Sequence, residues 1–472
     1  MTGANGEESM APKTSGRKWA WTLAAVALVA AFALSEGKPQ TSDLPRTYRD
    51  AVEIAKWLDA AAIKTAAGLA WPADPRDPKT INTTLYSGTP GVILFYLEMD
   101  AAARYYTPPS ALYAGAYLKQ AEAGGDDLIA RIPAETGTGL YEGLGGMAFA
   151  LEETYKATKD QKYRMAFLEA MDGIAAKARV RDRGYDFGDI TDIISGSAGT
   201  GLVLLYAYKE TGDRRWLDLA AKTGDSLWAR GTAKAGGLDW AMDWKSPRRY
   251  PNFSHGTAGV AFFLARLSEA TGKKAYLDAA LAGAKYLLSI AETDGDACLI
   301  YHDEPDGKDL YYLGWCHGPV GTANLFYELF KITRAPEWME WVEAAARGLM
   351  DSGIPEKETP GFWNNAGICC GLAGVADFFR ALNRLSKNET HLLFGQRAVD
   401  MLRKKATADA AGMRWVQAEH RMRPDLLVAQ TGLMQGAAGI GIVLLRYAAG
   451  EHQIQEAGAA APIRIVLPDA AF

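Results

Sequence analysis

The sequence predicts an all-α fold in which seven helical hairpins form an α/α toroid, a double barrel of seven inner and seven outer helices. A short pattern, Gly-x-x-Gly followed by about ten apolar residues, occurs seven times along the chain. Between the copies lie segments in which apolar residues recur every three or four positions, as in amphipathic helices. The first and last copies resemble the others, which favours a closed ring over a solenoid with atypical terminal repeats.

The seven copies of the glycine pattern begin 53 to 65 residues apart. We expect each copy to lead into an inner helix, because the residues after the glycines are apolar on nearly all sides. Glycine permits a tight turn and close approach of neighbouring backbone. The residues just before the glycines should therefore meet at one end of the barrel. The copies begin at Ser87, Glu142, Ser195, His255, His317, Cys370 and Gln435.

The amphipathic segments between the glycine copies are the expected outer helices. Their charged residues alternate with apolar ones at helical spacing, so one face can pack inward while the other meets water. These polar segments are too frequent for a protein embedded in a bilayer. Examples are RTYRDAVEIAKWLDAAA, QKYRMAFLEAMDGIAAKA, RRWLDLAAKTGDSLWA, KKAYLDAALAGAKYLLSI and PEWMEWVEAAARGLM.

The barrel is expected over residues 44–450, preceded by a leader (1–43) and followed by a tail (451–472). In the leader, Arg17 and Lys18 precede sixteen mostly apolar residues, 19–34. That pattern is typical of a signal peptide or a signal anchor, and Ala31-Phe32-Ala33 offers a small-x-small cleavage sequence. Positive charge before the apolar run predicts a barrel outside the cytoplasm. A cytoplasmic protein with a disordered leader is the alternative.

Composition narrows the functional classes. A net charge of −5 without a long Lys/Arg run gives no reason to expect a nucleic-acid partner. A chain of 472 residues, 49% hydrophobic and 23% charged, can bury a large core. Four cysteines are too few for a disulfide framework in a chain of this length.

Three of the four cysteines belong to the glycine pattern. Cys316 and Cys369 each lie two residues before the first glycine of their copies, and Cys370 occupies the position of His317. Three thiolates from adjoining turns suit a catalytic zinc ion with one ligand position left for a substrate thiol. The alternatives are small buried side chains or a disulfide that involves the adjacent pair. Cys298 lies outside the pattern, and we expect it to be structural.

Two further residues are candidates for acid–base chemistry. His255 precedes the glycines of the fourth copy, at the position that Cys370 and His317 have in theirs. We expect it to act as an acid or base, with a hydrogen-bonded structural histidine as the alternative. Asp192 lies four residues before the first glycine of the third copy. It is either an active-site carboxylate or a helix cap.

These features together resemble the lanthionine synthetase C-like proteins, over residues 44–450. The resemblance is carried by the seven repeats, by Trp-Cys-His-Gly at residues 315–318 and by Cys-Cys-Gly at residues 369–371. It implies a double seven-helix barrel that holds one zinc ion. In such proteins the zinc activates a peptide cysteine for addition to dehydroalanine or dehydrobutyrine, which forms a (methyl)lanthionine thioether.

The resemblance also implies which residues hold the zinc. Cys316 and Cys369 correspond to the first two ligands, and Cys370 stands where most members have histidine. Zinc with three thiolates carries one net negative charge, whereas two thiolates and an imidazole leave it neutral. A substrate thiolate at the three-cysteine site should be more nucleophilic, and the metal a weaker acid toward it. Tyr312 stands where some members have an arginine.

Acid–base roles follow from the same resemblance. His255 and Asp192 correspond to the active-site histidine and aspartate, and His317 occupies a position held by tyrosine or histidine. After thiol addition, His255 or His317 would protonate the enolate carbon.

The resemblance implies a dehydrated peptide, or a small thiol such as glutathione, as the partner. A separate dehydratase is expected, because the chain is too short to contain one, and the apolar segment 19–34 could attach the protein to a membrane. Two other classes remain open. One is a non-catalytic, zinc-containing protein that binds peptides or glutathione at a membrane. The other is a glycoside hydrolase, which should carry a pair of carboxylates at the mouth of the toroid; Asp192 alone supports it poorly.

Overall fold

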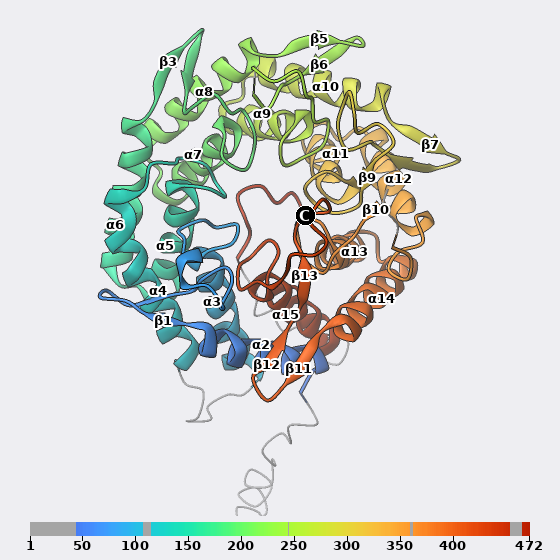
Figure 1. Ribbon diagram of the computed structural model, residues 1–472. Coiled ribbons are helices and arrows are strands. Elements are labelled where there is room, and N and C mark those ends of the chain that lie inside the picture. Colours follow the sequence, from blue (N-terminus) through green and yellow to red (C-terminus); the bar gives the residue numbers. More distant parts are fainter. Residues whose placement is uncertain (1–43, 107–114, 244, 359–361, 454–464) are drawn as a thin grey trace, which may run out of the picture. The chain divides into compact units, whose positions relative to one another are not determined.

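Seven inner helices form a closed row in the computed structural model, which describes residues 44–106, 115–243, 245–358, 362–453 and 465–472 (Figure 1). Each inner helix packs on the next, and the last packs on the first. The expected all-α toroid is therefore confirmed. The inner helices are α3 (Thr89–Tyr106), α5 (Leu144–Thr158), α7 (Ser197–Thr211), α9 (Thr257–Thr271), α11 (Pro319–Thr333), α13 (Leu372–Ser386) and α15 (Ala437–Gln453).

Seven outer helices surround this row in the described part of the chain. From α4 onward, each outer helix packs against the inner helix that precedes it in sequence, whereas α2 packs against α15. The first and last helices of the barrel are thus partners, and their contact helps to close the ring. The outer helices are α2 (Arg46–Ala61), α4 (Ala116–Arg131), α6 (Gln161–Ala176), α8 (Arg214–Ala229), α10 (Lys274–Ser289), α12 (Glu337–Asp351) and α14 (Glu389–Lys405).

Short strand pairs follow the outer helices, a feature that the helical periodicity did not predict. The antiparallel pairs are β1 (Ile63–Lys64) with β2 (Leu69–Ala70), β3 (Arg179–Arg181) with β4 (Gly184–Asp186), β5 (Thr232–Lys234) with β6 (Gly237–Asp239), β7 (Glu292–Asp294) with β8 (Ala297–Leu299), β11 (Thr407–Asp409) with β12 (Gly412–Arg414), and β13 (Val416–Ala418) with β14 (Leu427–Ala429). The pair β9 (Tyr311–Tyr312) and β10 (Phe362–Trp363) is parallel. Two short 3-10 helices complete the regular structure, η2 (Pro78–Thr80) and η3 (Ile132–Ala134).

Tryptophan side chains fix three of these strand pairs to the preceding outer helix. Trp71, Trp240 and Trp415 each donate the indole N–H to a carbonyl thirteen residues earlier, near the end of that helix, at 2.7 to 2.9 Å. The indoles are buried and their donors are satisfied, as buried tryptophan requires.

The loops that lead into the inner helices are joined by a circuit of backbone hydrogen bonds, which we call the mouth ring. It contains seven N–H···O=C bonds of 2.8 to 3.2 Å among the described residues. With one exception, at Ile193, each donor immediately precedes the first residue of a glycine copy. The bonds run from Tyr86 to Tyr141, Tyr141 to Ile194, Ile193 to Ser254, Ser254 to Cys316, Cys316 to Cys369, Cys369 to Met434, and Met434 back to Tyr86.

The second glycine of each copy has a steric reason. A Cβ there would lie within 3.0 Å of the carbonyl oxygen six residues earlier, in the loop of the mouth ring. Real Cβ atoms do not approach carbonyl oxygens so closely. Glycine therefore lets each inner helix begin directly against its own loop. The glycines are Gly91, Gly146, Gly199, Gly259, Gly321, Gly374 and Gly439.

The C-terminal residues 465–472 pack among the inner helices, in the lumen of the barrel (Figure 1). The amide of Ile465 donates to Glu98 of α3 at 2.9 Å, and the ring of Phe472 stacks on Tyr327 of α11 at 4.6 Å. Between them, Asp469 accepts a hydrogen bond from the hydroxyl of Tyr141, a member of the mouth ring. The chain end thus forms part of a compact unit that spans Pro45–Phe472.

The leader predicted over residues 1–43, with its apolar segment 19–34, lies outside the described residues. Among the residues that the structure does describe, none of the helices has the length and apolar character needed to span a bilayer.

The steric role of the glycines predicts the effect of adding one methyl group. Gly259→Ala places a Cβ against the carbonyl of Phe253 and should lower the free energy of unfolding by about 1–3 kcal/mol. In α15, a Cβ at Gly450 would meet no atom within 4 Å, so Gly450→Ala should be neutral or stabilising by up to about 1 kcal/mol. Urea unfolding of both variants tests this, and equal midpoints would contradict the steric argument.

Candidate metal centre and active site

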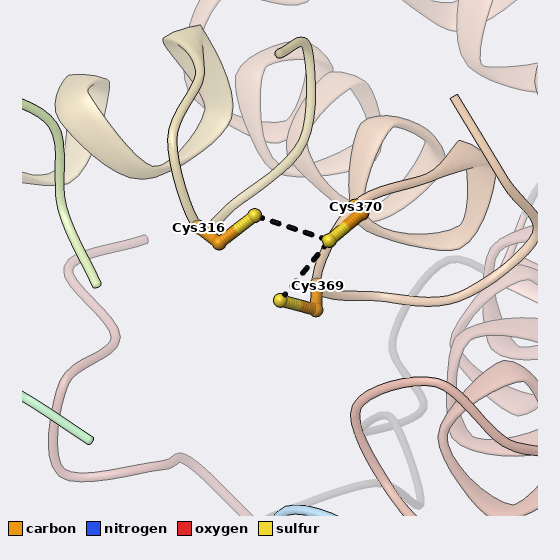
Figure 2. Close-up of side chains that lie close together, drawn as sticks. All are labelled: Cys316, Cys369 and Cys370. Atoms are coloured by element: carbon orange, nitrogen blue, oxygen red, sulfur yellow. Dashed lines mark hydrogen bonds between the residues drawn. The ribbon is translucent and has the colours of Figure 1, made fainter. Parts of the chain in front are cut away.

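Three cysteines meet where the loops before α11 and α13 lie side by side in the mouth ring (Figure 2). The Cys370 Sγ lies 3.2 Å from that of Cys316 and 3.5 Å from that of Cys369. All three sulfurs lie within 4.8 Å of one another, and the side chains are buried. The predicted cluster of repeat-equivalent cysteines is therefore present.

Glycines allow the two cysteine loops to approach. A Cβ on Gly314 would lie within 3.0 Å of the Cys369 carbonyl oxygen and of the Cys370 Cα. The amide of Cys316 donates to the same carbonyl at 3.0 Å. The backbone contact thus holds the sulfurs together independently of any contact between the side chains.

The donor set fits a zinc ion. Tetrahedral zinc with Zn–S bonds of about 2.3 Å separates its sulfurs by about 3.8 Å, close to the spacing of these thiols. Soft sulfur ligands without carboxylates favour zinc over magnesium or calcium. None of the four cysteines forms a disulfide, and Cys298 lies apart in β8, where burial raises the pKa of its thiol to about 11. Cys298 therefore takes no part in the cluster.

The protonation of the three thiols also indicates that the cluster suits a cation. Hydrogen bonds from Cys316 and Cys369 lower the pKa of the Cys370 thiol well below its usual value. Burial raises the pKa of the Cys316 and Cys369 thiols well above theirs. Three thiolates can therefore coexist here only with a positive charge among them, which a metal ion supplies.

An amide network supports Cys370 from the neighbouring loop. The side-chain amide of Gln435 donates to the Cys370 sulfur at 3.4 Å and to the Tyr86 hydroxyl at 3.1 Å. Asn365 donates in turn to the Gln435 carbonyl oxygen at 2.9 Å. Sequence analysis overlooked this contact, although Gln435 begins the seventh glycine copy and so occupies the position of Cys370.

His255 and Asp192, which the sequence offered as separate candidates, form a pair. The His255 Nδ1 lies 2.6 Å from one Asp192 carboxylate oxygen, while the other oxygen accepts hydrogen bonds from the amides of Ser195 and Gly196. Asp192 thus bonds to the turn just before α7 as well as to the imidazole, and it does not cap that helix. Burial opposes charge on His255, but the hydrogen bond and charge of Asp192 outweigh it and raise the pKa of the imidazole. His255 is thereby suited to donate a proton from Nε2.

His317 lies beside His255, with ring centroids 5.4 Å apart, but its environment differs. Its Nδ1 is buried without a hydrogen-bond partner in the described structure, and burial holds its pKa well below the usual value. Neutral His317 is therefore a poor proton donor, so the structure favours His255 of the two candidates.

Two residues at the mouth were not predicted. His302 lies in the loop after β8, with its ring 4.1 Å from that of His317 and its Nδ1 2.5 Å from Asp303. His302 belongs to none of the seven glycine copies, so the repeat pattern could not single it out. The only feature of the sequence that could have indicated it is the adjacent Asp303. Arg421, between β13 and β14, hydrogen-bonds to Tyr312. A guanidinium from a distant loop thus lies beside Tyr312, which stands where some family members have an arginine.

Comparisons with known proteins agree with this geometry. A family model described as "Lanthionine synthetase C-like protein" matches residues 79–456. The structure of nisin cyclase superposes with a TM-score of 0.59 at 16% identity, covering 86% of this chain and 94% of that one. At this identity the likeness shows the fold alone.

Two further matches either cover less of the matched protein or superpose less closely. Glutathione S-transferase LANCL1 of Danio rerio is 23% identical over 145 residues, which is 30% of this chain and 33% of that protein. The chain therefore aligns with only about a third of this curated relative. A variant of an alpha-1,6-mannanase of Salegentibacter sp. HEL1_6 has a TM-score of 0.47 at 13% identity, covering 84% of this chain and 98% of that one, too low to bear on function.

The contact between His255 and Asp192 predicts a measurable change in the histidine titration. Asp192→Asn removes the negative charge that stabilises the imidazolium, so the pKa of His255 should fall. NMR titration of the histidine ring protons measures this. His391, which is bonded to Glu343 on the outer wall, provides the internal control and should not shift. An unchanged His255 pKa would show that the carboxylate does not control its protonation.

Proposed function

Because the chain belongs to the lanthionine synthetase C-like family, we propose that it catalyses the zinc-dependent addition of a cysteine thiol to dehydroalanine or dehydrobutyrine in a peptide. The product is a (methyl)lanthionine thioether. The observation that carries the proposal is the cluster of Cys316, Cys369 and Cys370 beside the His255–Asp192 pair. The dehydrated peptide comes from a separate dehydratase.

In this proposal the three cysteines hold the zinc, which when bound favours the thiolate form of the substrate sulfur. The sulfur attacks the β-carbon of the dehydro residue, a C–S bond forms, and the π electrons move into an enolate. His255 then delivers the proton from Nε2 to the α-carbon and becomes neutral. It lies near enough to the cluster for the charge of Cys370 to contribute to its raised pKa.

The other two classes are less well supported. A glycoside hydrolase needs a pair of carboxylates free to act on a glycosidic bond, but Asp192 is already engaged by an imidazole and two amides. A non-catalytic protein that binds peptides or glutathione would keep the cysteines without needing a proton donor. The name of the Danio rerio relative makes glutathione a reasonable small thiol to test as the nucleophile.

Zinc content tests the metal part of the proposal. The purified chain should contain one zinc ion, and Cys316→Ala, Cys369→Ala and Cys370→Ala should each lose most of it, because three protein ligands are the usual minimum for a catalytic site. Cys298→Ala is the matched control and should retain zinc. Metal analysis by mass spectrometry gives the result. Full zinc in Cys370→Ala would remove that residue from the site.

Addition of glutathione to a peptide that contains dehydroalanine tests the chemistry, by the mass gained. His255→Asn should keep zinc and slow the addition by about 10²–10⁴-fold, the usual loss of a general acid. Cys370→His should also keep zinc, since imidazole is a good ligand, but should react more slowly because the site loses a negative charge. If both variants match the parent, the cyclase proposal fails and the binding protein takes its place.

A further inference from the structure

We propose that His302 is a second catalytic histidine, the base that removes the proton from the incoming thiol. The inference rests on the proposed function and adds to it, because thiol addition requires one proton to leave sulfur and another to reach carbon. The site then contains two histidine–carboxylate pairs with opposite duties. His255–Asp192 gives a proton and His302–Asp303 takes one.

The position of His302 brings it to the cysteine site from outside the repeat pattern. Its ring lies 4.1 Å from that of His317 and 4.3 Å from that of Tyr312, so it packs beside the residues next to Cys316. It lies near enough to Cys370 for each group to influence the charge of the other. The side chain keeps 11% of its surface exposed. In this proposal, a thiol that approaches the cysteine cluster comes within reach of this imidazole.

The partners of His302 determine which nitrogen is available. Its Nδ1 lies 2.5 Å from Asp303, whose carboxylate also accepts two hydrogen bonds of 2.9 Å from the guanidinium of Arg248. A carboxylate on Nδ1 favours the tautomer with its proton there and leaves the lone pair on Nε2. Asp303 and Arg248 are positioning residues in this arrangement, because they act through His302.

The environments of the two pairs move their pKa values apart. Burial lowers the pKa of His302, and its hydrogen bond to Asp303 only partly opposes this because Arg248 compensates the carboxylate charge. Asp192 has no such cation in its hydrogen bonds, and the pKa of His255 is raised. Opposite shifts in neighbouring groups are typical of an acid and a base. The titratable and charged groups around His302 are Asp303, Arg248, Tyr250, Tyr312, His317 and Cys370.

With His302 and His255 together, both proton transfers of the reaction are accounted for. His302 Nε2 takes the thiol proton and becomes an imidazolium, while the sulfur electrons form the C–S bond at the β-carbon. The enolate then takes a proton from the His255 imidazolium at the α-carbon. One histidine ends charged and the other neutral, and exchange with solvent restores both. No oxidant, reductant or other reactant is needed.

Addition rates measured with thiols of different acidity distinguish a catalytic role of His302 from a purely structural one. His302→Gln should keep zinc and slow the addition of an alkyl thiol such as glutathione by about 10²–10⁴-fold. It should slow the addition of an acidic aryl thiol such as thiophenol far less, because that thiol arrives already ionised. In the pH–rate profile of the parent protein, the rate should fall at acidic pH as His302 is protonated. This fall, the acidic limb of the profile, should be absent in His302→Gln.

His391→Gln is the matched control, because it removes another buried histidine bonded to a carboxylate, on the outer helix α14. It should retain the parent rate for both thiols. Asp303→Asn keeps the His302 ring but removes its positioning carboxylate, so it should show the same preference for the acidic thiol. It provides the decisive measurement if His302→Gln fails to fold or to bind zinc.

Equal slowing of both thiols, or an acidic limb that persists without His302, would overturn the assignment while leaving the cyclase proposal intact. A parent protein that retains zinc but adds neither thiol would instead overturn the proposed function, and this assignment with it.

Discussion

The mouth ring of backbone hydrogen bonds is the constraint on which the rest of this molecule depends. Cys316 and Cys369 are members of the ring, and Cys370 follows directly after one. The distance between the cysteine loops is therefore set by peptide groups rather than by side chains. A metal site built this way needs little rearrangement when its ligands lose their protons, because the framework is already bonded in a circle.

Much of the fold and part of the site could be predicted because the seven copies of the glycine pattern can be aligned position by position. Equivalent positions in seven copies of one pattern must meet at one end of a ring, so the clustering of the three cysteines followed from spacing alone. His255 was found by the same argument. Asp192 was weighed as either a helix cap or an active-site carboxylate; its two carboxylate oxygens bond to the turn before α7 and to His255, and it does not cap the helix.

Contacts made by the segments between repeats could not be predicted in this way. Asp303 and Arg248 are 55 residues apart, and Arg421 reaches Tyr312 from more than a hundred residues away. No periodicity relates such pairs, because these loops vary in length and carry strands that the helical spacing does not indicate. The candidate site thus combines residues from the regular mouth ring with residues from irregular loops.

The pairing of α2 with α15, together with the C-terminal residues in the lumen, has a consequence for biosynthesis. A ribosome releases the end of the chain last, so α2 must emerge long before its partner exists. The barrel therefore cannot close before α15 has left the ribosome, and until then it is an open arc with an exposed apolar edge, a state in which proteins are prone to aggregate. A bulky group attached after Phe472 would have to be accommodated in the lumen or would displace residues 465–472.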